Sequence, residues 1–182
     1  MGKEKFEEFI NQSETQEEKI DWEKRKQWFI EKVNEFYKVI DSYLEPYKDK
    51  IKINAIETVI YEDELGSYKV KKRILNVKGH KVEFTPIGTI IIGAWGRIDM
   101  EGPNGKVKFV LVPEYSEAPK IEGKILLNDK DIKKWEEKQK KEAEEIKKAK
   151  KVWKIATPPP NIRYFDLDED IFFDKLMEVI DG

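Results

Sequence analysis

The sequence predicts an α+β fold in which a long N-terminal helix packs on a curved, partly rolled antiparallel sheet of about five strands. Apolar residues recur at helical spacing through residues 15–48, and their period changes to two from residue 51. A charged helix is predicted over residues 128–153, followed by a short C-terminal helix. A chain of 182 residues can bury a hydrophobic core, so we expect a single domain, residues 1–182.

The first helix is predicted over residues 15–48. Thr15 and Glu18 have the spacing of a capping box at its start, and Pro46 lies where the periodic pattern fades. One stripe of residues recurs at spacings of three, four or seven: Trp22, Phe29, Val33, Phe36, Ile40, Tyr43 and Tyr47. This aromatic stripe is expected to face the core.

The antiparallel sheet is predicted over residues 51–127. Alternating apolar residues between turn signals place its strands at 51–62, 67–77, 81–85 resumed at 89–94, 97–101 and 106–112, with a short further strand at 120–127. Pro86 interrupts the third strand and predicts a bulge or an edge. Lys78–Gly79 and residues 102–105 predict hairpin turns.

Five of the ten glycines fall between residues 84 and 113, in a segment that is otherwise strongly apolar. Glycine within a strand marks a bulge, a bend or a close approach of two backbones, so the sheet is expected to curve here. We therefore predict that this segment is the structural centre and that any functional site lies beside it.

The C-terminal third is predicted to contain two helices. Asn128 or Asp129 caps the charged helix, whose apolar residues form only a thin seam, so it is expected to stand largely in solvent. Three prolines at 158–160 form an extended spacer. Residues 161–182 are acidic, and their apolar positions predict the short closing helix.

Composition excludes several classes of protein. Charged residues make up 40% of the chain and cysteine is absent, which excludes disulfide scaffolds, thiolate zinc sites and a cysteine nucleophile. Many Lys and Glu residues without cysteine are typical of thermophilic proteins. The first residues lack a signal peptide and no segment has 18 consecutive apolar residues, so a soluble, cytoplasmic protein is expected. The sequence contains no cofactor-binding motif, so no cofactor is predicted.

Arg97 and Asp99 are the candidate polar pair of the glycine-rich segment. Residues spaced by two on a strand project from the same face of the sheet. As a site, Arg97 would hold an anion and Asp99 a metal ion or a proton. As scaffold, the two side chains form an ion pair at the rim of the sheet, and this is the interpretation that we favour.

The same segment resembles the central hairpin of the PD-(D/E)xK nucleases. Residues 96–100, a hairpin turn and residues 109–113 carry the resemblance. It implies that Asp99 binds Mg²⁺ and that Glu31 or Glu35 of the long helix supplies a further acid.

The second strand departs from that family. Leu111 and Pro113 stand where the family has Glu and Lys, and the missing Glu-x-Lys spelling occurs only at residues 122–124, beyond a loop. The resemblance therefore implies at most a degenerate or divergent nuclease.

Three functions follow from these observations. The leading hypothesis is a non-enzymatic binding or accessory protein that acts through protein–protein contacts or self-association, because no complete catalytic motif is present. The alternative is a carboxylate–metal enzyme centred on Asp99. A third is binding of nucleic-acid backbones by the lysine-rich helix at 129–151, against which its interleaved Glu residues argue. His80, the only histidine, is predicted to face solvent beside a hairpin turn.

Overall fold

The computed structural model describes residues 2–11, 21–89, 91, 93–120 and 128–182. The predicted α+β class is confirmed, because the strands of this part of the chain form a single antiparallel sheet with helices beside it. The sheet is a meander in which the strands pair in chain order: β1 (Ile51–Glu62), β2 (Gly66–Val77), β3 (His80–Gly88), β4 (Gly96–Gly102), β5 (Gly105–Pro113), β6 (Lys151–Ala156) and β7 (Tyr164–Asp166). The helices are α1 (Gly2–Asn11), α2 (Trp22–Leu44), a 3-10 turn (Glu45–Tyr47), α3 (Asp129–Lys148) and α4 (Glu169–Asp181).

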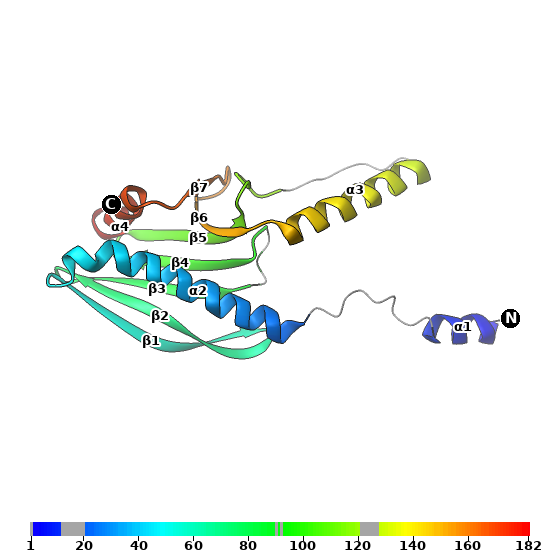
Figure 1. Cartoon of the computed structure of the whole chain (residues 1–182), viewed down its shortest axis with the longest axis horizontal. Coiled ribbons are helices and arrows are strands. Elements are labelled where there is room, and N and C mark those ends of the chain that lie inside the picture. Colours follow the sequence, from blue (N-terminus) through cyan, green and yellow to red (C-terminus); the bar gives the residue numbers. More distant parts are fainter. Residues whose placement is uncertain (1, 12–20, 90, 92, 121–127) are drawn as a thin grey trace.

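Helix α2 crosses one face of the sheet (Figure 1). Its N-cap is Asp21, whose carboxylate accepts a hydrogen bond from the backbone N–H of Lys24 at 3.1 Å. Four residues of the predicted stripe, Phe29, Val33, Phe36 and Ile40, are confirmed on the buried face, which also contains Tyr37 and Leu44. Trp22 and Tyr43 are only half-buried, and Tyr47 is 45% exposed in the 3-10 turn after the helix. The predicted helix start at residues 15–20 lies outside the described residues.

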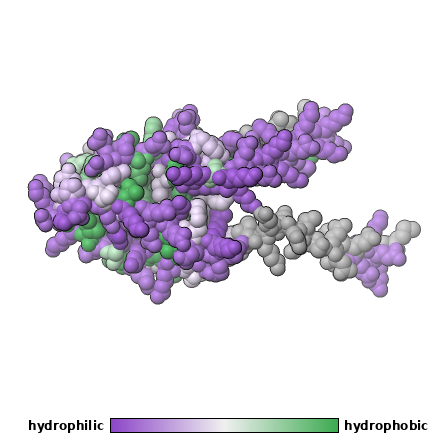
Figure 2. All heavy atoms as spheres, in the orientation of Figure 1, coloured by the Kyte–Doolittle hydropathy of each residue, from purple (hydrophilic) through white to green (hydrophobic). Residues whose placement is uncertain are grey.

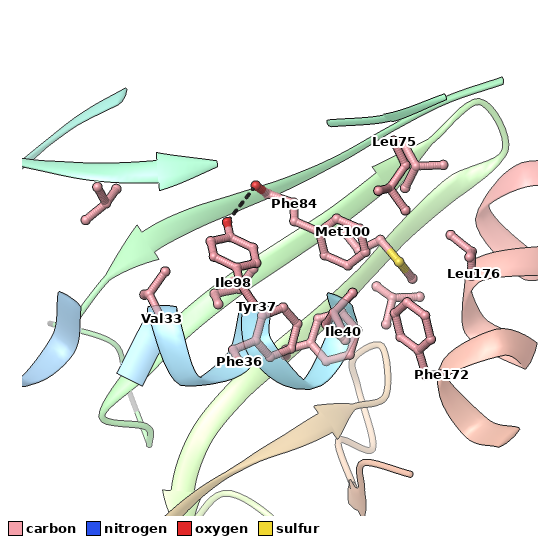
Figure 3. Packing of buried hydrophobic residues seen from close by; sticks show 14 of the residues in the cluster. Val33, Phe36, Tyr37, Ile40, Leu75, Phe84, Ile98, Met100, Phe172 and Leu176 are labelled. Carbon is pink, nitrogen blue, oxygen red and sulfur yellow. Dashed lines mark hydrogen bonds between the residues drawn. The ribbon is translucent and has the colours of Figure 1, made fainter. Parts of the chain in front are cut away.

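Phe36 is the centre of an aromatic core between α2 and the sheet (Figure 3). Its ring centroid lies 4.9 Å from that of Phe109 in β5 and 6.1 Å from that of Phe84 in β3. Trp153 of β6 packs on it at 5.4 Å. Helix α4 closes the end of this core, where Phe172 stacks on Phe84.

Two local features of the meander agree with the sequence. The turn between β2 and β3 is Lys78–Gly79, and both residues have positive φ (49° and 85°), as a two-residue hairpin turn requires. The register between β3 and β4 shifts between Pro86 and Gly88, which confirms the predicted bulge. His80 lies next to the turn and is exposed, as expected.

The sheet has more strands than the predicted five. The charged helix, predicted over 128–153, ends at Lys148, and residues 151–156 pair with β5 as β6. The helix pattern of the sequence was misread here because Trp153 continues the apolar spacing of α3. In the fold its ring packs on α2 and its indole N–H donates to the carbonyl of Lys32 at 2.9 Å. Strand β7 was also not predicted.

The resumed strand at 89–94 is a second correction. In its described residues only Ile91 and Ala94 form an isolated bridge. Gly88 and Gly93 have positive φ, which turns the backbone away from the ladder, and Thr89 donates its backbone N–H to the side chain of Glu62 at 2.7 Å rather than to a strand. The short strand predicted at 120–127 falls almost entirely outside the described residues.

Helix α3 projects from the body of the molecule (Figure 1), and none of its residues is buried. Its surface is almost wholly hydrophilic (Figure 2). Among the described helices, none is long and apolar enough to cross a membrane.

Candidate functional site

The predicted pair of Arg97 and Asp99 forms a closed ion pair. Arg97 donates from Nε and Nη2 to the two carboxylate oxygens of Asp99, at 2.6 and 2.7 Å. Only 6% of the Asp99 side chain is exposed, and Lys106 lies 3.7 Å from the same carboxylate. The hydrogen bonds to Asp99 raise the pKa of Arg97. Both partners thus satisfy each other within the outer face of the sheet.

The structure does not bring Asp99 together with Glu31 or Glu35. Ile98 and Met100 point into the core beneath α2 (Figure 3). The alternation along β4 therefore turns Asp99 to the opposite face. Glu31 and Glu35 are exposed on the other side of α2. Across the described residues, no group of three His, Asp or Glu side chains is arranged to hold a metal ion.

A different polar site lies where three distant segments meet. The N-terminal end of α2, the bend before β4 and the junction of α3 with β6 line an open pocket of about 690 Å³. We call it the tryptophan pocket. Its lining residues are Asp21, Lys24, Arg25, Trp28, Lys32, Trp95, Lys147, Ala149, Lys150 and Lys151. A volume of this size suits a drug-sized or nucleotide-sized ligand.

Trp95 holds two cations at this pocket. The guanidinium carbon of Arg25 lies 5.0 Å from the centroid of its indole ring, and the ammonium of Lys151 lies 4.6 Å from it. Trp28 packs edge-to-face against Trp95, with centroids 6.3 Å apart. The electron-rich indole face attracts both cations and so offsets their mutual repulsion.

A network of hydrogen bonds through Thr89, Glu62 and Tyr68 holds Arg25 in place. Its Nη2 donates to the backbone carbonyl of Thr89 at 3.2 Å. The carboxylate of Glu62 in turn accepts hydrogen bonds from the Thr89 N–H at 2.7 Å and from the Tyr68 hydroxyl at 2.6 Å. A Cβ at Gly88 would lie 2.5 Å from this carboxylate, so a side chain at this position would push the carboxylate out of its present arrangement. Burial lowers the pKa of Arg25 from its ordinary value and raises that of Tyr68.

Lys151 connects the pocket to α3. Its ammonium donates to the carbonyls of Ile146 and Lys147 in the last turn of that helix, where a cation complements the helix dipole. Burial lowers the pKa of Lys151. The side chain therefore holds the end of α3 and the indole of Trp95 in one arrangement.

The charge of the tryptophan pocket differs sharply from that of the chain. The chain carries a net charge of −2, whereas the lining has six cationic side chains and one acid, Asp21. Asp21 is engaged as the N-cap of α2. Cations fixed beside indole faces suit an anion that carries a planar group.

The sequence alone did not single out these residues. Trp28 lies off the core stripe of α2, and Trp95 lies in the glycine-rich segment beside which a site was expected. A tryptophan outside the buried stripe was the one local signal. The meeting of residues 25, 95 and 151 depends on the tertiary fold, which a single sequence does not display.

The pocket can bind and orient an anion, since its lining places six cationic side chains beside two indoles. No protein-family model, curated protein or solved structure matches this chain.

Proposed function

We propose that this chain is a non-enzymatic binding protein whose tryptophan pocket takes the phosphates and bases of a single-stranded nucleic acid. The observation that carries the proposal is the combination of two indoles with six cations and one acid in a pocket of about 690 Å³. Aromatic platforms beside a basic groove are the usual way of binding single strands without sequence preference.

The cations supply the phosphate contacts. Lys24 is exposed over 85% of its side chain, and Arg25 and Lys151 are held in place over Trp95. Lysine continues along the end of α3 at 147, 148 and 150, so basic groups extend beyond the pocket. A polymer with regularly spaced phosphates uses such an extension, whereas a lone phosphate does not.

The indoles supply the planar contact. Trp28 and Trp95 are both partly exposed, and every base has a face that stacks on an indole irrespective of its sequence. The two indole rings are nearly perpendicular, so the face of one and the edge of the other form a corner. We propose that a base packs in this corner. On α3, nucleic acid would therefore contact the C-terminal end of the helix rather than its whole length.

The first experiment measures binding of a fluorescently labelled oligothymidylate by anisotropy as a function of salt. We expect Lys24→Glu to weaken binding about tenfold and to reduce the slope of log affinity against log salt by about one. The matched control is Lys48→Glu, because Lys48 is also exposed and also pairs with an acid three residues earlier, but lies beyond the other end of α2, after the 3-10 turn. Equal affinities of the two variants would contradict the proposal.

A second comparison separates phosphate binding from base stacking. An abasic oligonucleotide of the same length keeps the phosphates and removes the bases. We expect it to bind more weakly than oligothymidylate, and inorganic phosphate to compete only at far higher concentration. Equal binding of the abasic strand would show that the indoles do not stack on bases.

A further inference from the structure

Strand β1 is an unusually open edge of the sheet. It lies at one end of the strand order, and no other described segment pairs with its outer side (Figure 1). All twelve of its residues pair with β2 in a register without a bulge. The opposite edge, β7, has only three residues. A long edge with neither proline nor bulge is normally avoided, since its free backbone groups invite another strand.

The side chains of β1 are also apolar where they meet solvent. Ile53, Ile56, Val59 and Tyr61 are exposed over 36–69% of their surface. Ile53, Val59 and Tyr61 lie on one face of the strand and Ile56 lies on the other, so a partner that covered one face alone would leave part of them in water. The partner must therefore be another strand that extends the sheet.

We propose that this partner is β1 of a second copy of the chain, paired antiparallel about a two-fold axis that passes between the two Ile56 residues. Identical edges related by a two-fold axis perpendicular to the sheet pair antiparallel. In this register Ile53 faces Val59 of the copy and Ile51 faces its Tyr61, so the apolar residues meet one another.

The side chains that face each other across the axis select this register from its neighbours. With Ile56 at the axis, Lys52 faces Ile60 and Glu57 faces Ala55 of the copy, so no like charges lie directly opposite each other. A shift that places Glu57 at the axis brings two like charges directly opposite each other, which is unfavourable. A shift in the other direction, with Ala55 at the axis, opposes Ile53 to Glu57. Of these three registers, only the one with Ile56 at the axis both sets Ile53 opposite Val59 and keeps like charges from facing each other.

The oligomeric state of the full chain is the first test. We expect sedimentation equilibrium to give twice the mass of 21.6 kDa at high concentration and a return to that mass on dilution. Ile56→Lys should abolish the dimer because two like charges would meet at the axis. Ile132→Lys, an identical change at a residue of α3 with similar exposure, should leave it intact. A monomer at every concentration would overturn the proposal, as would a dimer that persists in Ile56→Lys.

The register can be tested by disulfide cross-linking of single introduced cysteines, because the natural chain contains no cysteine. Under oxidation Ile56→Cys should give a disulfide-linked dimer, because the two substituted residues face each other within the distance that a disulfide spans. Val59→Cys is the control: its two copies would lie six residues apart along the strands, about 20 Å. Equal cross-linking of the two variants would overturn the register.

Discussion

Tyr37 shows how a single buried polar group is satisfied in the aromatic core. It is 2% exposed, and its hydroxyl donates to the backbone carbonyl of Phe84 at 3.1 Å. The guanidinium of Arg73 lies 4.7 Å from its ring centroid. Burial raises the pKa of Tyr37 well above its ordinary value.

This shift predicts that the free energy of unfolding falls in alkaline solution. The folded state keeps the Tyr37 proton at a pH where the unfolded chain, with a tyrosine pKa of about 10, has released it. The contribution of Tyr37 to the free energy of unfolding is therefore fully present below about pH 10, and it is lost as the pH rises above that value. Tyr37→Phe should cost about 1 kcal/mol at neutral pH and make the alkaline decline shallower.

Urea unfolding from about pH 8 to about pH 11 checks this prediction. In Tyr37→Phe the alkaline decline of the free energy of unfolding should persist in part, because the pKa of Tyr68 is raised as well. Tyr115→Phe, at an exposed position, serves as the control and should follow the natural chain. A decline in Tyr37→Phe as steep as in the natural chain would contradict the assignment.

Two glycines of one hairpin differ in what surrounds them. A Cβ at Gly102 would overlap the backbone carbonyl of Val179 in α4, whereas a Cβ at Gly105 would meet open space. The backbone of α4 stays at this distance because Asn104 donates its N–H to Val179 at 2.9 Å and its side-chain amide to the carbonyl of Ile180.

We expect Gly102→Ala to lower the free energy of unfolding by about 1–3 kcal/mol, since α4 must shift to admit the methyl group. Gly105→Ala should leave stability unchanged or raise it by up to about 1 kcal/mol, because it restricts the unfolded chain without a clash. Urea unfolding of the two variants measures the difference. Equal stabilities would show that the hairpin and α4 are not in close contact.

At the scale of elements, α2 and α3 are helices of opposite character. Helix α2 is held by an apolar face against the sheet, whereas α3 has no buried residue and depends on local pairs such as Lys138 with Glu142 at 3.8 Å. Local pairs of this kind contribute only about 0.2–0.5 kcal/mol each. The two helices should therefore open with very different free energies.

Hydrogen–deuterium exchange resolved by peptide measures this contrast. Amides of α3 should exchange orders of magnitude faster than the buried amides of α2, except in its last turn, where Lys151 binds the carbonyls of Ile146 and Lys147. Faster exchange throughout α3 in Lys151→Gln would identify that side chain as its anchor. Protection of α3 equal to that of α2 would contradict a solvated helix.

The elements that the sequence predicted correctly are those that depend on residues close together in the chain. The stripe of α2, the Lys78–Gly79 turn and the bulge at Pro86 follow from side-chain spacing and backbone preference, and all three are present. Strand β6 was missed because its apolar spacing continues that of α3. Its pairing with β5 is what makes it a strand, and that pairing joins residues about forty positions apart.

At the scale of the molecule, hydrogen bonds through one residue, Glu62, connect the two proposed surfaces. Glu62 ends the open edge strand β1, and its carboxylate fixes Thr89, which in turn accepts from Arg25 of the tryptophan pocket. In the proposed dimer, antiparallel pairing would place the two pockets at opposite ends of the paired strands. A single strand of nucleic acid would then meet the pockets separately.

The sequence by itself determined the class of the fold, the buried face of α2, the turns of the meander and the spacing that pairs Arg97 with Asp99. Each depends on residues within a few positions of one another, where periodicity and backbone preference act. The tertiary structure decided that β6 and β7 complete the sheet, that Asp99 faces away from α2, and that Arg25, Trp95 and Lys151 meet. Those outcomes depend on contacts between distant segments, whose relative positions are set by packing of the whole core.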